Sequence, residues 1–590
     1  MNTIQFTPCA VLLLAWSATA QERVAVFEGA GGGVGSIALY DAASGVHVAS
    51  PVEFANLAWI PFDFAGRTEL DEFSPTRPRR FTDVAGASRL RLQHGIGSLY
   101  HFARAAADGS ASYGYLLIAP TGRPRILFER AGVGTGAGRN PFLSLIAVAP
   151  DGASFLAATQ GEAGGNLFEI ATIDTPSIVD RTANLPPARI YPSSLALGFA
   201  SGFAVTNFGV LRFDRASALD AAFIPFGADL PPTWFSGQLV QSNDTSHVVF
   251  TAGTAFDALH VYSAGASGDA RRATVTPGVV GPAGSAADGA SGPWLAVSDD
   301  GVWCAWRTSI GVTHECMVSR AVGVPTPALQ LSADANFLDT LDEVALFAFR
   351  GPSRLLFAVG EQNPGGPPGK LDLFAADLAP ASAPQISNLT QTSGQATAPF
   401  TVAPVLKPGR AVFLPDRSGI VIHDDAGQQG QIYVWRDGQP GLQLVLAPLK
   451  DLLDIDFGGP GAVFAVRRDN GVHSLYRTDS AFNSAPILVA SSTNGTTYSG
   501  LRARSDGWTA FVEKTAVGET LKRVDSLSGA IQTLSGGPAL FGAAIGWSGS
   551  GRLLATRIQN GVSSHIAWTS PLAPVRLFSN GGVGQVLLGD

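Results

Sequence analysis

Two aspartates stand two residues apart in a stretch that otherwise has the apolar pattern of a strand. The stretch is DLLDIDFGG (Asp451–Gly459), and the pair is Asp454 and Asp456. Residues two apart on a strand point to the same face, so the two carboxylates lie together. Such a pair can hold Ca²⁺, which takes oxygen ligands, or share a proton in acid–base chemistry. The simpler interpretation, which we favour, is that water or a salt bridge to Arg467 or Arg468 satisfies the pair.

A second acidic spot and three long loops are weaker candidates for a site. Asp424 and Asp425 stand together in HDDAGQQGQ, which suggests Ca²⁺ on the same grounds. The loops at residues 61–81, 214–235 and 361–370 carry charges, aromatics or prolines, and loops on a rigid scaffold often carry function. Solvated connectors are the simpler interpretation of each loop. The histidines are scattered and no G-x-S-x-G nucleophile motif occurs, so we predict no catalytic residues.

The two cysteines after Cys9 lie close together in WCAWRTSIGVTHECMVS. If the chain turns near Ile310, Cys304 and Cys316 lie opposite each other on adjacent antiparallel strands. A Cα separation of roughly 4.5 Å in such a pair suits a disulfide, and we predict this bond in an exported protein. His314 and Glu315 adjoin Cys316, but two ligands on a hairpin are too few for zinc.

The elements that must position these residues form a repeat. The stretch LIAVAPDGASFLAATQGEAGGNLFEIATID (Leu145–Asp174) consists of an apolar run, an Asp-Gly turn, an apolar run, a loop and a further apolar run. The same order recurs from Trp294, Ala411, Gly500 and Gly542, and more loosely elsewhere. About eleven such units, most of them roughly 50 residues apart, fill the chain, a period typical of propeller blades and solenoid coils.

Each unit offers short strands and tight turns, and amphipathic helical stretches are almost absent. A four-stranded meander cannot bury both faces alone, but it can when it packs radially against its neighbours in a ring. The aspartates of the Asp-Gly turns supply residues that tolerate positive φ, so we interpret them as structural. The sequence therefore predicts an all-β fold, a β-propeller built from about eleven four-stranded blades.

The unit APDGASFLAAT…GNLFEIATID resembles the WD-repeat-like propeller repeat of TolB-like periplasmic proteins. This repeat also occurs in the propellers of prolyl-oligopeptidase-type enzymes. The resemblance covers nearly all units and implies blades only, because the repeat carries no active-site residues. The chain departs from both groups, since we expect neither the α/β domain that precedes the blades of TolB nor the hydrolase domain of the peptidases.

Eleven blades exceed the usual four to eight in one ring, so we predict two tandem propellers. Residues 1–20 are the expected signal peptide, 21–280 the N-terminal propeller and 290–590 the C-terminal propeller. The Gly-, Ala- and Pro-rich stretch at 275–293 marks the expected boundary, and the stretch at 391–409 is the rival boundary. One large ring is the alternative, if the final GQVLLGD pairs with the first blade.

The first residues predict export. An apolar core at 10–16 leads into Ala18-Thr19-Ala20, a pattern that signal peptidase cuts after Ala20, so we expect a periplasmic or secreted protein without a membrane span. The net charge of −8 argues against a nucleic-acid partner. We predict a binding or scaffold protein that presents loops on one propeller face to a protein or glycan. The alternative is a secreted polysaccharide lyase or glycosidase with its site on the channel face.

Overall fold

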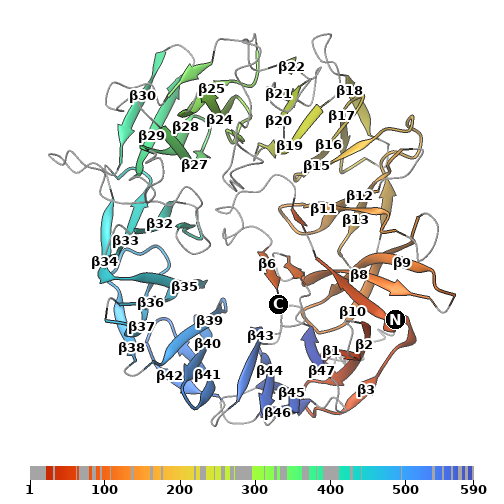
Figure 1. Cartoon of the computed structure of the whole chain (residues 1–590), viewed down its shortest axis with the longest axis vertical. Helices are drawn as coiled ribbons and strands as arrows, with labels where there is room; N and C mark the ends of the chain where they lie inside the picture. Colours follow the sequence, from red (N-terminus) through yellow and green to blue (C-terminus); the bar gives the residue numbers. More distant parts are fainter. Residues whose placement is uncertain are drawn as a thin grey trace, which may run out of the picture.

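The computed structural model describes residues 22–587 apart from short internal segments, the longest of which are 65–78, 226–233, 273–294, 332–341, 362–370 and 390–410. Secondary structure in the described residues consists of strands β1 to β47 and one 3-10 turn, η1 (Val52–Phe54). The strands form antiparallel sheets arranged around a ring (Figure 1). The predicted all-β fold of four-stranded blades is confirmed.

Blades 3 to 11 are meanders whose four main strands follow one another along the chain. The first strand of a blade lies towards the middle of the ring and the fourth lies at its rim (Figure 1). The strands of blades 3 to 6 are β11 (Phe142–Val148), β12 (Ser154–Thr159), β13 (Leu167–Ala171), β14 (Ile178–Asp180); β15 (Ile190–Leu197), β16 (Ser201–Thr206), β17 (Gly209–Asp214), β18 (Ala222–Pro225); β19 (Trp234–Gln241), β20 (His247–Gly253), β21 (Leu259–Gly265), β22 (Arg271–Arg272); and β23 (Leu295–Val297), β24 (Trp303–Ile310), β25 (Thr313–Arg320), β26 (Leu329–Gln330).

The remaining meanders complete the second half of the ring (Figure 1). The strands of blades 7 to 11 are β27 (Asp342–Arg350), β28 (Arg354–Glu361), β29 (Leu371–Ala379), β30 (Ser382–Asn388); β31 (Ala411–Phe413), β32 (Gly419–Asp424), β33 (Gly430–Arg436), β34 (Gln443–Leu449); β35 (Asp451–Gly458), β36 (Gly461–Arg467), β37 (His473–Asp479), β38 (Ile487–Ser491); β39 (Thr497–Ala503), β40 (Trp508–Thr515), β41 (Gly518–Asp525), β42 (Ile531–Thr533); and β43 (Leu540–Trp547), β44 (Leu553–Gln559), β45 (Val562–Trp568), β46 (Pro574–Leu577).

The two ends of the chain meet in blade 1. Its first strand is the last strand of the sequence, β47 (Val583–Leu587), which pairs with β1 (Arg23–Ala30), and β2 (Val34–Asp41) and β3 (His47–Ala49) follow. Val26 of β1 lies opposite Val586 of β47. The chain therefore closes as one large ring, which was the alternative arrangement, rather than as two tandem rings. The predicted boundary between residues 280 and 290 lies outside the described residues, and β19 and β20 before it contact β23 after it.

Blade 2 departs from the pattern because two strands, β4 and β7, both pair with the inner edge of its second strand, β8. Its regular strands are β7 (Ser88–Arg91), β8 (Ser98–Ala105), β9 (Ala111–Ile118) and β10 (Pro124–Ala131). The preceding segment adds β4 (Leu57–Ile60), which pairs with β2 and β8; β5 (Asp63–Phe64), which runs parallel to β11; and β6 (Arg79–Thr82), which pairs with β7. This segment connects the inner edges of blades 1, 2 and 3.

Apolar side chains fill the spaces between neighbouring blades. All six residues of β12 are buried, because the middle strands of a blade are covered on both faces. Between blades 3 and 4, Leu156 and Leu167 pack with Leu195, Leu211 and Phe213. Burying each such side chain is worth about 1.5–3 kcal/mol. The near-continuous apolar runs of the repeat follow from this two-sided burial.

The turn aspartates act as the sequence predicts. In the first turn of blade 3, the Asp151 carboxylate accepts a hydrogen bond from Ala153 N at 3.0 Å, and Gly152 has a φ of +68°. Asp300 accepts from Val302 N at 3.0 Å in the corresponding turn of blade 6. These turns join the first strand of a blade to the second, and the turns from the third strand to the fourth emerge on the same side of the ring. We call this side the Asp-turn face.

The innermost strands are irregular, which the sequence pattern did not predict. Within the described residues, the register between first and second strands shifts at β11, β15, β19, β27, β35, β39 and β43. A bulge of this kind releases backbone groups from the ladder. Those groups need other partners if they are buried.

The cysteines do not face each other. Cys304 lies opposite Ser319, and Cys316 lies opposite Arg307. Ile310 lies opposite Thr313, so the strands are paired in a later register than expected, and the two thiols lie in different apolar clusters on opposite faces of blade 6. The predicted disulfide is wrong, and the structure has no bond between these sulfurs.

Candidate functional site

The Asp454–Asp456 pair lies on the innermost strand of blade 9 and reaches blade 10. Asp454 Oδ2 accepts a hydrogen bond from Leu501 N at 2.8 Å, and Asp456 Oδ2 accepts one from Ala503 N at 2.9 Å. Leu501 and Ala503 belong to β39, the innermost strand of blade 10. The predicted common orientation of the two carboxylates is confirmed, and both point across the blade interface.

A bulge in β39 explains why the Leu501 amide needs the carboxylate of Asp454. The ladder between β39 and β40 breaks between Ser499 and Arg502, and Gly500 in the break has a φ of +65°. Leu501 therefore lacks a ladder partner in β40. The carboxylate of Asp454 takes its place, so the acid pair joins the bulged strand to the neighbouring blade.

The environment of Asp454 makes its carboxyl group unusually basic. Burial penalises the charged form and raises the pKa of Asp454 from 3.8 to about 6, and the nearby Asp456 carboxylate acts in the same direction. The Arg502 guanidinium and the amides of Leu501 and Ile455 oppose this rise. A carboxyl group that titrates this close to neutrality is suited to proton transfer.

The arginines expected to neutralise the pair bind elsewhere. Arg467 Nε donates to Asp451 Oδ2 at 2.7 Å, and Arg468 donates to the Tyr476 hydroxyl. The expected salt bridge to Arg467 or Arg468 is therefore wrong. Across the part of the chain that the structure describes, no three His, Cys, Asp or Glu side chains gather in a group able to hold a metal ion. Ca²⁺ at Asp454 and Asp456 stays a prediction and would need further ligands.

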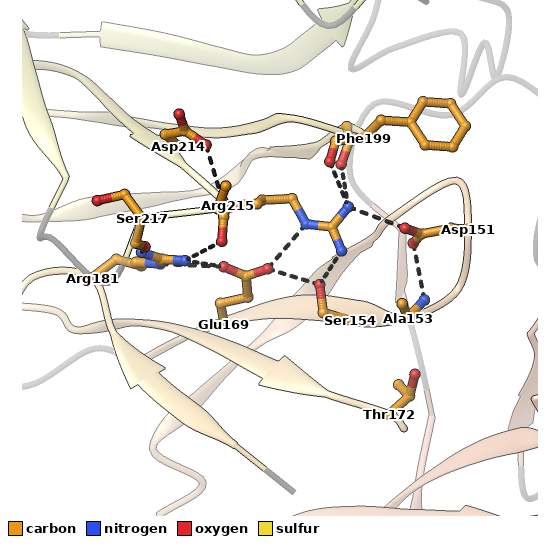
Figure 2. Close-up of polar contacts among 12 residues, drawn as sticks. Asp151, Ala153, Ser154, Glu169, Thr172, Arg181, Phe199, Asp214, Arg215 and Ser217 are labelled. Atoms are coloured by element: carbon orange, nitrogen blue, oxygen red, sulfur yellow. Dashed lines mark hydrogen bonds and ion pairs between the residues drawn. The ribbon is translucent and has the colours of Figure 1, made fainter. Parts of the chain in front are cut away.

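A second polar centre joins blades 3 and 4 (Figure 2). Glu169 lies on β13. Its Oε2 accepts a hydrogen bond from Arg181 Nη2 at 2.6 Å, and its Oε1 accepts one from Arg215 Nε at 3.1 Å. Ser154 Oγ donates to the same Oε1 at 2.8 Å and accepts from Arg215 Nη2 at 3.0 Å. One carboxylate thus serves two guanidinium groups, with Arg215 contributed by the turn that follows β17.

Both arginines of this centre also donate hydrogen bonds to backbone carbonyl oxygens of blade 4. Arg181 is only 2% exposed, its guanidinium lies 4.5 Å from the centre of the Phe213 ring, and Nη1 donates to Ser217 O. Arg215 Nη1 donates to the carbonyl oxygens of Gly198 and Phe199. The centre is therefore a clamp between blades 3 and 4, and the donors and acceptors of the clamp bind groups of the protein itself.

Similar arginine contacts cross other blade interfaces. Each runs from the third strand of one blade, or from a first turn, to a carbonyl oxygen of the next blade: Arg436 Nε to Ala481 O at 3.0 Å, Arg477 Nη1 to Ser526 O at 3.3 Å, and Arg504 Nη1 to Gly551 O at 3.1 Å. Such contacts fix neighbouring blades in register, which apolar packing alone does not do.

These arginines were not among the residues predicted to form a site, although their spacing in the sequence is regular. An arginine recurs within two residues of the aspartate at the end of the third strand, as Arg215 beside Asp214 and Arg436 beside Asp437. For Arg436, Arg477 and Arg504 the partner carbonyl lies about one repeat further along the chain. Arg215 instead reaches back to Glu169 of the preceding blade and to carbonyls of its own blade. The identity of these partners follows only from the placement of the blades.

The weaker candidates lie partly outside the described residues. Asp424 ends β32, whereas Asp425 begins the segment 425–429, which is not described. The described parts of the loops at 61–81 and 214–235 include β5, β6 and β18, and Glu361 of the third loop ends β28. The segments 65–78, 226–233 and 362–370 are not described. The binding role of these loops stays a prediction.

Comparisons with known proteins match only part of the chain. No family model and no curated protein matches its sequence. Among solved structures, a prolyl endopeptidase aligns with a TM-score of 0.29 and 11% identity over 63% of this chain and 54% of its own. The β-propeller domain of the Trilobed protease from Pyrococcus furiosus aligns at 0.24 and 10% over 58% of this chain and 97% of its own. TolB from Acinetobacter baumannii aligns at 0.24 and 12% over 65% and 78%.

Proposed function

We propose that this protein is an exported binding scaffold, a closed propeller ring that holds a macromolecular partner on one face. The observation that supports the proposal is the use of the acid pair singled out for chemistry. Asp454 and Asp456 accept backbone amides of the neighbouring blade, so they hold the frame together. A rigid frame keeps the turns on its faces in fixed positions, which lowers the entropic cost of binding.

The closure of the ring supports the same proposal. The last strand completes the first blade, and hydrogen bonds and ion pairs cross the interfaces between blades. In the described residues, no helix is long and apolar enough to cross a membrane. Export rests on the apolar leader at residues 1–20, and the partner is a protein or a glycan.

The test is a pull-down from the envelope fraction with the tagged protein lacking residues 1–20 as bait. We expect a partner in stoichiometric amount. The Glu169→Gln bait serves as a control, because its clamp between blades 3 and 4 is broken and a partner held by the intact frame should bind it less. Recovery of no partner by the intact bait would contradict the proposal.

The second candidate is a polysaccharide lyase or glycosidase, and one observation favours it. Asp454 lies on an innermost strand and has a pKa of about 6, in the range of a general acid or base. The test incubates the protein with acidic and neutral polysaccharides and looks for shortened chains. If such an activity is found and survives in Asp454→Asn, Asp454 is not its acid or base.

A further inference from the structure

Two arginines stacked on tryptophans lie on the Asp-turn face where blades 10 and 11 meet. Arg504 belongs to the turn between β39 and β40, and its guanidinium lies 5.7 Å from the centre of the Trp547 ring. Arg523 lies near the end of β41, and its guanidinium lies 4.2 Å from the centre of the Trp508 ring. A guanidinium stacked on an indole is held in one plane, so its N–H donors keep a fixed direction.

The carboxylate of Asp506 connects the surroundings of the two arginines. Its Oδ2 lies 3.4 Å from Arg504 Nη1, and its Oδ1 accepts a hydrogen bond from Trp508 N at 3.3 Å. Burial lowers the pKa of Arg523, Asp506 opposes this fall, and Arg504 adds to it. The three charged groups are therefore close enough to act on one another. Two guanidinium groups share one carboxylate, which leaves one positive charge in excess.

The protein uses only part of each guanidinium. Arg504 Nη1 donates to Gly551 O at 3.1 Å, and Arg523 Nε donates to Gln532 Oε1 at 2.9 Å. Within the residues that the structure describes, Nη2 of Arg504 and both Nη atoms of Arg523 donate no hydrogen bond. The side chains of Arg504 and Asp506 are 32% and 42% exposed, so a ligand can reach these donors. A Cβ at Gly551 would clash with the Arg504 guanidinium, so the fold leaves room for this group.

The clamp between blades 3 and 4 has the same ratio of charges but is closed. There Glu169 serves Arg181 and Arg215, whose side chains are only 2% and 13% exposed. Nη1 of each of these arginines donates to a backbone carbonyl oxygen of blade 4. The pair at blades 10 and 11 thus keeps towards solvent the kind of donor that the clamp uses internally.

We propose that Arg504, Asp506 and Arg523 bind a uronate residue of an acidic glycan. The free Nη donors hold the sugar carboxylate, because hydrogen bonds from a guanidinium to a carboxylate are strong and directional. Asp506 accepts a hydrogen bond from a hydroxyl group of the same sugar. This proposal rests on the proposed function and names the glycan class and the site that holds it.

The Asp506 carboxylate is the reason for choosing a uronate among anionic ligands. A negative charge placed beside Asp506 is repelled unless the ligand also supplies a donor for this carboxylate. A uronate carries hydroxyl donors on the ring that bears its carboxylate. Inorganic sulfate and the glutamate side chains of an acidic peptide carry the charge but no hydroxyl beside it.

The first test measures binding of oligosaccharides by calorimetry to the protein lacking residues 1–20. The probes are hexamers of galacturonate and of mannuronate, and the comparisons are a neutral galactose hexamer, a glutamate hexapeptide and inorganic sulfate. We expect a uronate hexamer to bind at least about tenfold more tightly than each comparison. Failure of both uronate hexamers to bind, or equally tight binding of any comparison, would overturn the proposal.

Arg354 in blade 7 offers a matched control. Its guanidinium lies 5.7 Å from the centre of the Trp435 ring and 3.6 Å from the half-exposed Asp377 carboxylate. Arg350, which lies opposite Arg354, pairs with a carboxylate of its own, that of Asp437, at 2.7 Å. The control arginine is thus also stacked on an indole, but each of the two guanidinium groups has its own carboxylate.

The second test compares variants of the two places. Arg523→Gln should weaken binding of the uronate hexamer at least about tenfold, whereas Arg354→Gln should change it less than about twofold. Asp506→Asn should strengthen binding of sulfate and of the glutamate hexapeptide, and so reduce the preference for the uronate hexamer. Equal losses in the two arginine variants, or an unchanged preference in Asp506→Asn, would overturn the proposal.

The pull-down separates a failure of this proposal from a failure of the proposed function. If the intact bait recovers a partner but neither uronate hexamer binds, the ring is a scaffold that uses another surface, and only the uronate site is overturned. If the intact bait recovers no partner, the scaffold function fails, and the hexamers still decide whether the uronate site exists.

Discussion

The Asp454→Asn substitution tests the account of the blade 9–10 interface most sharply. Asparagine keeps an oxygen that can accept the Leu501 amide but carries no charge. The pKa of Asp454 is raised from 3.8 to about 6 by burial. A rise of this size corresponds to about 3 kcal/mol at roughly 1.4 kcal/mol per pKa unit, the amount by which ionised Asp454 lowers the stability of the fold.

The direction of the stability change with pH follows from proton linkage. Because the pKa of Asp454 is higher in the folded protein, the stability contributed by its protonated form is present below about pH 4 and is lost as the pH rises through about 6. The variant should therefore be more stable than the wild type at pH 7. Losing one of the two amide hydrogen bonds that Asp454 accepts offsets about 1 kcal/mol of the gain, which leaves about 2 kcal/mol.

The assay is thermal unfolding at pH 7 and at pH 4. A gain of about 2 kcal/mol, divided by the unfolding entropy of a chain of 590 residues, raises the Tm by about 2 °C if the ring unfolds as one unit. At pH 4 the gain should vanish. Asp456→Asn is the control, since Asp456 uses Oδ1 for Phe457 N and Oδ2 for Ala503 N, so the variant should lose stability at neutral pH. A stability gain of Asp454→Asn that is equal at both pH values, or a loss at pH 7, would contradict a raised pKa of Asp454 in the folded protein.

Three further results are expected. Glu169→Gln should cost about 3–5 kcal/mol in urea unfolding, because it removes the charge of the carboxylate that both the buried Arg181 and Arg215 contact. By contrast, Asp377→Asn at the half-exposed Arg354 pair should cost less than about 1 kcal/mol. Burial lowers the pKa of His101 from 6.5 to about 4, so NMR should show a neutral His101 ring at pH 5.5. The contribution of this neutral ring to stability is complete above pH 6.5 and is lost as the pH falls towards 4. A charged ring at pH 5.5 would contradict its burial. A chelator should leave the Tm unchanged, because Asp454 and Asp456 already accept amides, and a drop in Tm would restore Ca²⁺ to this site.

The strands and turns could be predicted because each is encoded locally. The Asp151–Gly152 turn needs a residue with positive φ next to a carboxylate that accepts a nearby amide, and both residues stand side by side in the sequence. The burial of β12 likewise follows from its continuous apolar run. Features of this kind recur once per blade, so the repeat made them visible.

The partners of the polar residues could not be predicted, because they lie on other blades. Asp454 points across an interface to Leu501, an amide released by a bulge that leaves no mark in the apolar pattern. The misplaced cysteines have a related cause, since moving the hairpin turn beyond Ile310 brings Ser319 rather than Cys316 opposite Cys304. Strand register depends on the turn, and a small displacement changes which residues meet.

The ring is closed by the pairing of β1 with β47. The most direct measurement replaces Val26 and Val586, which lie opposite each other, with cysteines in a background where Cys304 and Cys316 are serines. Val26→Cys with Val524→Cys, which lies in blade 10, is the control pair. Under mild oxidation we expect a disulfide between positions 26 and 586, seen as faster migration on a non-reducing gel, and none in the control. Failure of the 26–586 pair to form this bond in the folded protein would show that the ends of the chain do not meet and would contradict the closed ring.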